Sequence, residues 1–400
     1  MADYHLSCQE CEFESGEDQY YVMCPSCGGM LEVILDNDMQ DRVVDYSKPS
    51  IFKYHNFMPY SATPEHLEFE DYEDTPEFVD EAISEALGIE LIIKNEMVMP
   101  THTWKDREGF ITINRLMING IDDLMVFSSG NTGTSIARSA SIVKGPRLHL
   151  VIPLASKERL SQVQKYYNPK YVKISYFDGS NDECIVEAKR IAEEEGYVVE
   201  GGFSNYARRE GLKLLGLEHI WNSDFKIDWY AQPVAGGIGI YSFDKAYADS
   251  GKDTPRLLGV QAEICDPMVR AWRDNAADLS SRHIPESIVP SDFVRVLRTR
   301  DPGHAYGVLK KIVDRCSGGF ESVNEQQILE GLRLFYTSDY FRELYHRNGI
   351  LVGLEPATAL AGVAKAVRNG MIKKGSKVLL NVSGAAKHGD VKLSWIEDLI

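Results

Sequence analysis

The sequence predicts an open α/β architecture, in which helices cover the faces of a mostly parallel sheet. From about residue 90, short β-branched runs alternate with helical patterns, which is typical of this class. The chain has 400 residues, of which 44% are hydrophobic and 26% charged, so it can bury a sizeable core in two or three domains. It has no stretch of about 18 apolar residues, so we expect no membrane-spanning helix.

The expected parallel strands are short apolar runs, most of which precede loops of small residues. They cover residues 91–93, 124–127, 148–152, 171–174 and 378–382, with helical stretches such as Cys184–Glu195 and Pro356–Arg368 between them. Residues 64–88 are rich in Asp and Glu and indicate an acidic connector or a solvated helix face. Ligands of such sheets bind beyond the carboxyl ends of the strands, so the loops that follow strands are the most informative.

The charge balance disfavours some partners. Sixty acidic and 43 basic residues give a net charge of -17, which repels nucleic acid and anionic membranes. The N-terminus lacks the basic and apolar segments of a secretory signal, so we expect a cytoplasmic protein.

Four of the seven cysteines lie within the first 27 residues. They form two C-x-x-C pairs separated by twelve residues, Cys8 and Cys11, then Cys24 and Cys27. Two such pairs supply the four thiolates that tetrahedral zinc prefers, and they leave no position for a reactive water. The spacing therefore predicts one structural zinc per chain in a ribbon-like segment at residues 1–40; unligated or redox-active cysteines are the alternative.

Three loops of small residues are expected at strand ends. The strand ending at Phe127 runs into S-S-G-N-T-G-T-S at residues 128–135, and a helix-compatible run begins at Ile136. Free N–H groups at a helix start bind anions, although a turn capped by Ser and Thr gives the same pattern. The glycine turn at residues 235–239 is weak evidence alone, and the last strand opens onto Ser383. We expect these loops to converge on a ligand with two anionic ends.

Lys105 lies in P-T-H-T-W-K-D-R at residues 100–107, beyond a strand and between an aromatic residue and an acidic-basic pair. Partial burial and a nearby cation would favour its neutral amine, the form that makes an imine with a carbonyl cofactor. A salt-bridged surface lysine is the alternative. The three loops favour the active-site interpretation.

Taken in order with Glu355-Pro356, these motifs resemble fold type II pyridoxal phosphate (PLP) enzymes, which are tryptophan synthase β-like. The resemblance is to the threonine synthase and cysteate synthase branch, and residues 201–211 and 266–272 resemble cysteate synthases in particular. It implies two open α/β subdomains within a catalytic domain at 41–400, the smaller one, at about 120–215, being inserted into the larger.

The resemblance also implies site roles. Lys105 would bond covalently to PLP and move protons. Asn131 would form a hydrogen bond with the cofactor's ring hydroxyl, and Ser383 would face its pyridine nitrogen. The phosphate turn would consist of Gly236, Gly237, Ile238 and Gly239, and the substrate carboxylate would meet Ser129, Gly130 and Thr132. The chain has His102-Thr103-Trp104 where the family more often has Gly-Ser-Phe. His102 would meet a nucleophile or phosphate, or serve in packing.

The resemblance predicts an enzyme that releases phosphate from an O-phospho amino acid and adds a nucleophile. O-phosphoserine with sulfite, giving cysteate, is the preferred reaction. O-phosphohomoserine with water, giving threonine, another β-replacement and a dehydration are the alternatives, and a non-catalytic zinc-ribbon interaction protein is the alternative from another class. Arg208, Arg209 and Lys213 are the candidate ligands of the leaving phosphate, unless they form a solvated helix face. A homodimer is the family expectation.

Overall fold

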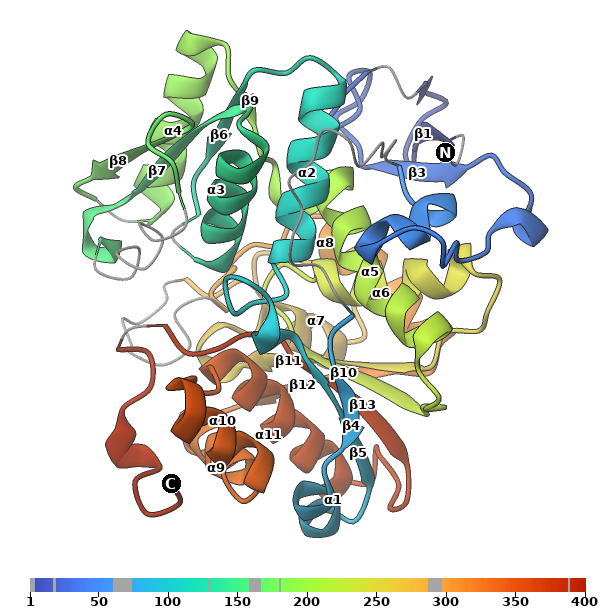
Figure 1. Cartoon of the computed structure of the whole chain (residues 1–400), viewed down its shortest axis with the longest axis vertical. Coiled ribbons are helices and arrows are strands. Elements are labelled where there is room, and N and C mark those ends of the chain that lie inside the picture. The colour runs from blue at the N-terminus through green and yellow to red at the C-terminus, as the bar shows by residue number, and fades with distance from the viewer. Residues whose placement is uncertain are drawn as a thin grey trace. The chain divides into compact units, whose positions relative to one another are not determined.

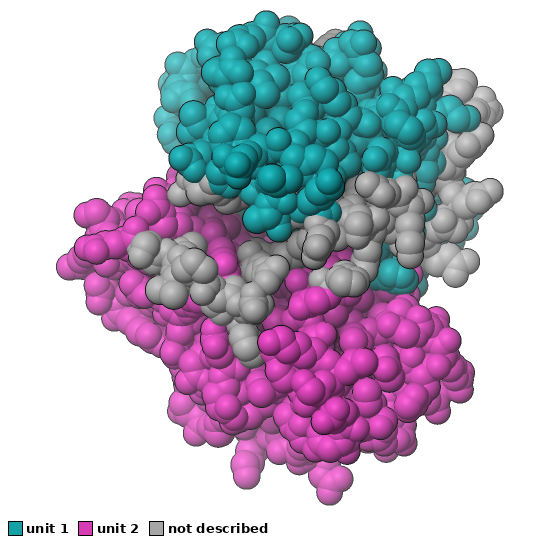
Figure 2. Space-filling view, turned by 90° about the vertical axis from the view of Figure 1, so that its left-hand side faces the viewer, with its two compact units in different colours: residues 1–74, 99–221, 245–252 teal, residues 75–98, 222–244, 253–400 magenta. Residues whose placement is uncertain are grey.

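The computed structural model describes residues 4–16, 19–59, 74–128, 130–157, 167–179, 181–286, 297–387 and 389–400. The chain divides into two compact units (Figure 2). Unit 1 comprises residues 1–74, 99–221 and 245–252, and unit 2 comprises residues 75–98, 222–244 and 253–400. Within the described ranges, no helix combines the length and the apolarity that crossing a bilayer requires. The boundary at residue 40 and the inserted subdomain stay predictions.

Unit 1 contains a four-stranded parallel sheet with the order β8-β7-β6-β9 (Figure 1). Its strands are β6 (Asp123–Val126), β7 (Arg147–Pro153), β8 (Val172–Phe177) and β9 (Val198–Val199). Alternate residues of β6 pack on opposite faces, Leu124 with α3 (Asn131–Val143) and Met125 with α4 (Asn181–Glu195). The sheet is therefore covered on both sides, as its apolar strands predict.

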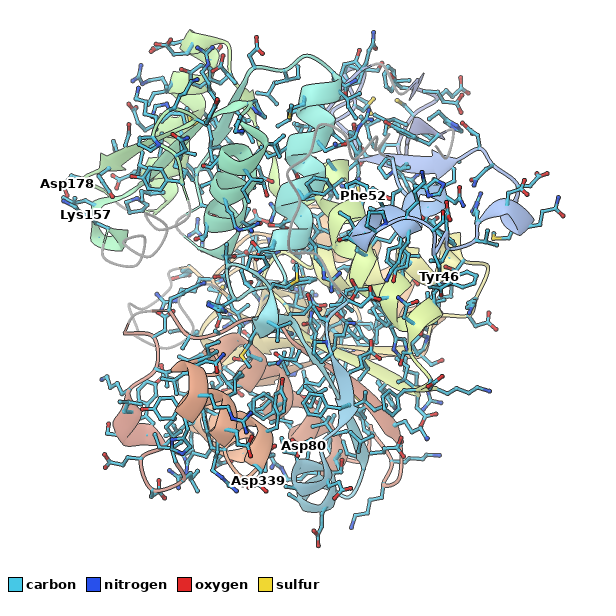
Figure 3. All side chains as sticks on the ribbon, viewed as in Figure 1. Tyr46, Phe52, Asp80, Lys157, Asp178 and Asp339 are labelled. Atoms are coloured by element: carbon cyan, nitrogen blue, oxygen red, sulfur yellow. The ribbon has the colours of Figure 1, made fainter. Side chains whose placement is uncertain are left out.

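The N-terminal part of unit 1 forms a small antiparallel sheet with the order β2-β1-β3. The elements are β1 (Tyr4–Cys8), β2 (Glu14–Ser15) and β3 (Leu31–Leu35), followed by the 3₁₀ helices η1 (Met39–Asp41) and η2 (Ser50–Phe57). This segment shares a core with α2 (Asp106–Ile118) and α5 (Tyr206–Asn222). Phe52, labelled in Figure 3, makes an edge contact with Phe110 at 6.0 Å between ring centroids. The cysteine-rich segment thus packs on the helix that follows Lys105.

Unit 2 contains a six-stranded sheet with the order β12-β11-β10-β13-β5-β4, parallel except for the antiparallel pair β4 and β5. The strands are β4 (Glu77–Val79), β5 (Glu90–Asn95), β10 (Trp229–Pro233), β11 (Arg256–Ala262), β12 (Gly319–Val323) and β13 (Lys377–Val382). The helices are α1 (Glu81–Leu87), α6 (Ile238–Asp249, which continues into unit 1), α7 (Pro267–Arg273), α8 (Ala305–Arg315), α9 (Glu325–Phe335), α10 (Asp339–Asn348) and α11 (Leu354–Arg368). Further 3₁₀ turns among the described residues are η4 (Glu96–Val98), η5 (Leu154–Ser156), η7 (Gly202–Ser204), η8 (Glu263–Cys265) and η9 (Leu393–Trp395), of which η5 and η7 belong to unit 1.

The sequence-based strands and helices are confirmed, with small shifts at their ends. The largest shift concerns α3, which begins at Asn131 and not at Ile136. The small polar residues of the loop therefore form the first helical turn. Part of the acidic stretch, residues 64–73, lies outside the described residues; the remainder contains α1, whose N-cap Asp80 accepts a hydrogen bond from Ile83 N at 3.0 Å (Figure 3).

Candidate active site

Two sets of hydrogen bonds hold the backbone around Lys105 at the start of α2. The Thr101 N–H and hydroxyl each donate to the Asp106 carboxylate at 2.7 Å, which closes the turn before the lysine. The Ser135 hydroxyl of α3 donates to the Lys105 carbonyl oxygen at 2.5 Å. Lys105 is therefore fixed both to its own helix and to the helix that begins with Asn131.

Glycines allow the three helices around Lys105 to approach closely. A Cβ at Gly109 of α2 would lie 2.3 Å from Ser135 Oγ of α3. A Cβ at Gly211 of α5 would lie 2.6 Å from the Arg107 carbonyl oxygen of α2. Both distances are far below van der Waals contact, so α2 can meet α3 and α5 in this way only at glycine.

The Lys105 amine lies in a buried group of charges. Its Nζ is 3.0 Å from Glu108 Oε2 and 4.7 Å from the centroid of the Trp104 ring. Glu108 is fully buried, and its Oε1 accepts hydrogen bonds from Thr132 Oγ1 at 2.6 Å and from Arg208 Nη2 at 2.9 Å. Arg208 also forms an ion pair with Glu200, with 2.8 Å between Nη1 and Oε1. Two anions and two cations thus meet within unit 1.

Burial lowers the pKa of Lys105, and the Arg208 cation lowers it further, although Glu108 partly opposes both effects. Burial alone would raise the pKa of Glu108, but Arg208, Lys105 and the Thr132 hydroxyl outweigh it and the pKa falls. The carboxylate therefore stays ionised while the amine loses its proton more readily than an exposed lysine does. The predicted nearby cation exists, but it is Arg208; the neighbouring Arg107 pairs with Glu218 at 2.5 and 2.8 Å.

Asn131 provides an observation that fits a bound cofactor. Its side-chain oxygen is buried and has no hydrogen-bond partner among the described residues. Such an atom is costly unless a ligand or water satisfies it. It occupies the first position of α3, where backbone N–H groups also lack helical partners. Gly130 and Thr132 flank it, whereas Ser129 lies outside the described residues.

Unit 2 carries the other predicted loops, which follow the carboxyl ends of neighbouring strands of its sheet. Strands β10 and β13 pair in parallel, so the glycine turn after Pro233 and the buried Ser383 follow adjacent carboxyl ends. The turn leads directly into the twelve-residue helix α6. Gly237 adopts φ +87°, and a Cβ built at Gly236 would have no atom within 4 Å. An open turn at a helix N-terminus fits a phosphate group.

Alanine substitutions of Gly236 and Gly237 should have different effects on stability and on cofactor binding. In Gly237→Ala, the Cβ would lie 2.2 Å from Leu309 Cδ1 on a left-handed backbone, so we expect the free energy of unfolding to fall by about 1–3 kcal/mol even without cofactor. Gly236→Ala should leave cofactor-free stability unchanged but weaken PLP binding, because its Cβ enters the open turn. Thermal unfolding and PLP titration of both variants check this. Equal stability of the two cofactor-free variants would contradict it.

The predicted phosphate ligands on α5 are largely occupied by protein partners. Arg209 is buried and donates to the carbonyl oxygens of Phe203 and Leu31. Lys213 is fully buried; it donates to Phe57 O at 2.6 Å and to Asp249 at 2.7 Å, and pairs with Glu210. The alternative of a solvated helix face is wrong, since the described part of α5 is almost wholly buried. These contacts argue against Arg209 and Lys213 as ligands of a leaving phosphate.

His102 lies in the loop before Lys105 and is half-buried with φ +58°. Its backbone N–H donates a hydrogen bond to the Met99 carbonyl oxygen at 2.7 Å. Sequence reasoning missed Glu108, which joins Lys105 to Arg208, and Glu200, which forms an ion pair with Arg208. A signal for Glu108 was available, because a residue three positions after Lys105 on a helix faces the same side.

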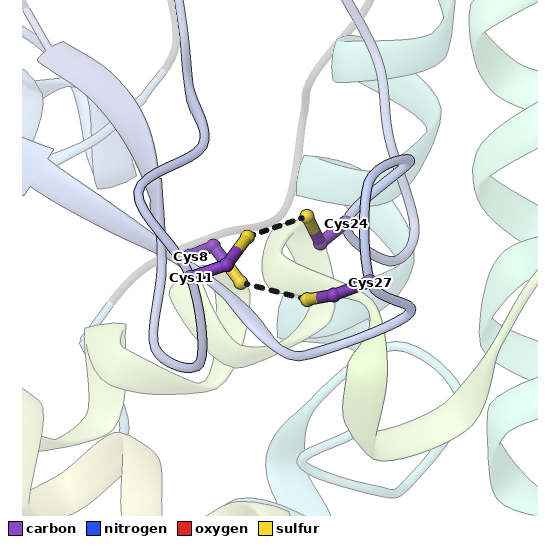
Figure 4. A group of neighbouring side chains, drawn as sticks. All are labelled: Cys8, Cys11, Cys24 and Cys27. Carbon is purple, nitrogen blue, oxygen red and sulfur yellow. Dashed lines mark hydrogen bonds between the residues drawn. The ribbon is translucent and has the colours of Figure 1, made fainter.

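The four N-terminal cysteines come together as their spacing predicts (Figure 4). Their sulfurs all lie within 4.8 Å of one another; Cys8 and Cys27 Sγ are 3.5 Å apart, and Cys11 and Cys24 Sγ 3.6 Å apart. Tetrahedral zinc with bonds of about 2.3 Å implies sulfur separations of about 3.8 Å, which these distances approach. The donor set fits zinc.

The chain has an open α/β fold, a half-buried lysine at the start of one helix and a glycine turn at the start of another. These features are typical of enzymes that carry a carbonyl cofactor on a lysine. The chain belongs to the pyridoxal-phosphate dependent enzyme family, whose model matches residues 69–384. The residues present fit this cofactor, in view of the unpartnered Asn131 oxygen and the open turn at Gly236.

Curated relatives cover nearly the whole chain. A cysteate synthase of Methanospirillum hungatei JF-1 is 28% identical over 96% of this chain and 90% of its own length. A threonine synthase of Methanosarcina acetivorans is also 28% identical, over 95% of this chain and 91% of its own. Both relatives therefore cover nearly the full length at the same sequence identity.

Solved structures share the fold. Threonine deaminase isoform 2 of Solanum lycopersicum has a TM-score of 0.65 at 17% identity, covering 92% of this chain and 93% of its own. Maize serine racemase has a TM-score of 0.63 at 20% identity, covering 80% of this chain and 90% of its own. The fold is thus the type II PLP fold that the sequence predicts.

Proposed function

We propose that this enzyme catalyses a PLP-dependent β-replacement in which O-phosphoserine and sulfite give cysteate and phosphate. The observation that carries the proposal is the half-buried Lys105 side chain, whose amine lies beside Glu108, in a member of this family. Among the full-length relatives, a cysteate synthase and a threonine synthase support a phosphorylated amino acid as the substrate.

The proposed PLP contacts follow the motifs described above. Lys105 would form the covalent attachment and Asn131 a hydrogen bond with the ring hydroxyl. Ser383 would face the pyridine nitrogen, and the N–H groups of the turn formed by Gly236, Gly237, Ile238 and Gly239 would hold the phosphate. A hydroxyl beside that nitrogen does not stabilise a protonated ring as a carboxylate does, which favours elimination over transamination.

Bound PLP supplies an electron sink that makes the Cα proton of an attached amino acid acidic. Lys105 Nζ takes that proton, because burial and Arg208 favour its neutral amine. The N–H groups at the start of α3, around Gly130 and Thr132, orient the substrate carboxylate. In the net reaction the Cβ–O bond to phosphate breaks, its electron pair leaves with phosphate, and the sulfur lone pair of sulfite forms the Cβ–S bond. Arg208 acts on the Lys105–Glu108 pair.

The second candidate is threonine synthesis from O-phosphohomoserine and water, which the equal identity to a threonine synthase supports. Phosphate release should be measured with each phospho amino acid, with and without sulfite, and the products identified by mass spectrometry. We expect sulfite-dependent cysteate from O-phosphoserine. Threonine from O-phosphohomoserine would establish the second candidate, and pyruvate from O-phosphoserine would indicate β-elimination of phosphate without addition of a nucleophile. No phosphate from either substrate would exclude both assignments.

We also propose that the four cysteines bind one structural zinc and that the enzyme is a homodimer. A non-catalytic protein that uses its ribbon for interactions is distinguished by colour, because PLP bound to a lysine absorbs visible light. Protein that stays colourless when PLP is added would favour the interaction protein.

A further inference from the structure

Glu108 is the residue for which sequence motifs assign no role, although it is the carboxylate in contact with the Lys105 amine. It occupies the third position of α2, three residues after Lys105, so both side chains lie on one face of the helix. A carboxylate in the first turn of a helix is stabilised by the helix dipole. The local geometry therefore favours an ionised Glu108 next to Lys105.

The contacts of Glu108 hold its carboxylate in one orientation. Oε2 accepts from Lys105 Nζ at 3.0 Å and from Arg208 Nη2 at 3.2 Å, while Oε1 accepts from Thr132 Oγ1 at 2.6 Å and from Arg208 Nη2 at 2.9 Å. These donors come from three helices, α2, α3 and α5, and the side chain is fully buried. Removing the donor Lys105 from Oε2 would leave the other three contacts in place.

We propose that Glu108 is a positioning residue for Lys105: it holds Nζ, with its proton, whenever Nζ carries no cofactor, and Arg208 weakens that hold so that the amine can react. This inference rests on the proposed use of Lys105 in the function above. The charged groups that face Nζ among the described residues are Glu108 on α2, Arg208 on α5 and Glu200 from the segment between β9 and η7. Helix α3 contributes the neutral Thr132, and the centroid of the Trp104 ring lies 4.7 Å from Nζ.

Glu108 and Arg208 should act on Lys105 in opposite directions. Replacing Glu108 by the isosteric Gln removes the anion that favours the protonated amine, so the amine should become nucleophilic at lower pH, by about 1–3 pH units. Replacing Arg208 by Gln removes a cation that disfavours the protonated amine, so the transition should move to higher pH. If Glu108 and Arg208 served only in packing, their substitutions would not shift the pH midpoint of Lys105 reactivity in opposite directions.

The test measures the reactivity of Lys105 in cofactor-free, full-length protein. Acetylation by acetic anhydride is followed between about pH 6 and 11 by peptide mass spectrometry, for the wild type, Glu108→Gln and Arg208→Gln. Glu210→Gln is the matched control, because Glu210 is a buried carboxylate of unit 1 that pairs with Lys213. We expect a downward shift of the midpoint in Glu108→Gln, an upward shift in Arg208→Gln and no shift in Glu210→Gln.

Coincident midpoints in the wild type, Glu108→Gln and Arg208→Gln would overturn the inference. If Glu108→Gln does not fold, the sign of the shift in Arg208→Gln decides alone. The rate at which cofactor-free protein gains visible absorbance with PLP gives a second pH profile, with the same expected order of midpoints. Wild-type protein that takes up no PLP would overturn the proposed function, whereas the acetylation profiles would still test the contact between Glu108 and Lys105.

Discussion

Replacing Lys105 by alanine is expected to reduce turnover by at least about 10³-fold while the protein still folds. The amine is both the proposed attachment point for PLP and the proposed proton carrier, so its loss should remove both functions. Steady-state phosphate release and the visible spectrum with PLP measure the two losses. Circular dichroism checks that the fold is retained, as expected because the Lys105 side chain is partly exposed, unlike Glu108.

The matched control is Lys157→Ala. Lys157 is an exposed lysine of unit 1 whose Nζ lies 5.4 Å from the centroid of the Tyr176 ring (Figure 3). Its loss should leave both turnover and colour unchanged. Full activity of Lys105→Ala would place the cofactor lysine elsewhere in the chain.

Loss of the zinc proposed for the cysteine cluster is expected to destabilise unit 1 strongly. The ribbon-like segment shares the core of α2 and α5, Tyr20 OH donates to Asn205 Oδ1 at 3.0 Å, and Leu31 O accepts from Arg209. Asn205 Oδ1 also accepts from Ala207 N at 3.0 Å at the start of α5, the helix that carries Arg208. Disorder of the ribbon-like segment would therefore disturb the position of Arg208, a partner of Glu108.

We expect Cys24→Ser to remove the bound zinc and to lower the free energy of unfolding by more than about 3 kcal/mol, or Tm by about 5–10 °C. Elemental analysis and thermal unfolding measure the two effects. Cys316→Ser, which changes a half-buried cysteine outside the cluster, is the control and should keep one zinc per chain. Purified wild-type protein without metal, or a Cys24→Ser variant with an unchanged Tm, would contradict the zinc assignment.

Much of the candidate site could be predicted because its signals are local. The apolar runs predicted the strands, and runs of small residues marked the loops at 128–135, 235–239 and Ser383. The C-x-x-C spacing predicted that Cys8, Cys11, Cys24 and Cys27 converge, and the contacts of Cys8 with Cys27 and of Cys11 with Cys24 join the two turns. Lys105 was identified from its neighbours in the chain and from the order of the motifs.

The basic residues of α5 show what local reasoning does not reveal. A run with Arg208, Arg209 and Lys213 in an acidic chain indicated either a phosphate site or an exposed face, yet all three are buried. Segments far away in the sequence supply their partners: Glu108 for Arg208, Leu31 for Arg209, and Phe57 and Asp249 for Lys213. A charge pattern along one helix does not reveal which other segments cover that helix.

The sequence by itself therefore determined the α/β class, the cysteine cluster, and the lysine and loops expected to bind the cofactor. The tertiary structure alone decided what surrounds the Lys105 amine, because Glu108 and Arg208 are 100 residues apart in the chain. They meet where Gly109 and Gly211 let α2, α3 and α5 approach to distances that any side chain would prevent. Such close packing depends on the positions of whole helices, which the order of residues along one of them does not reveal.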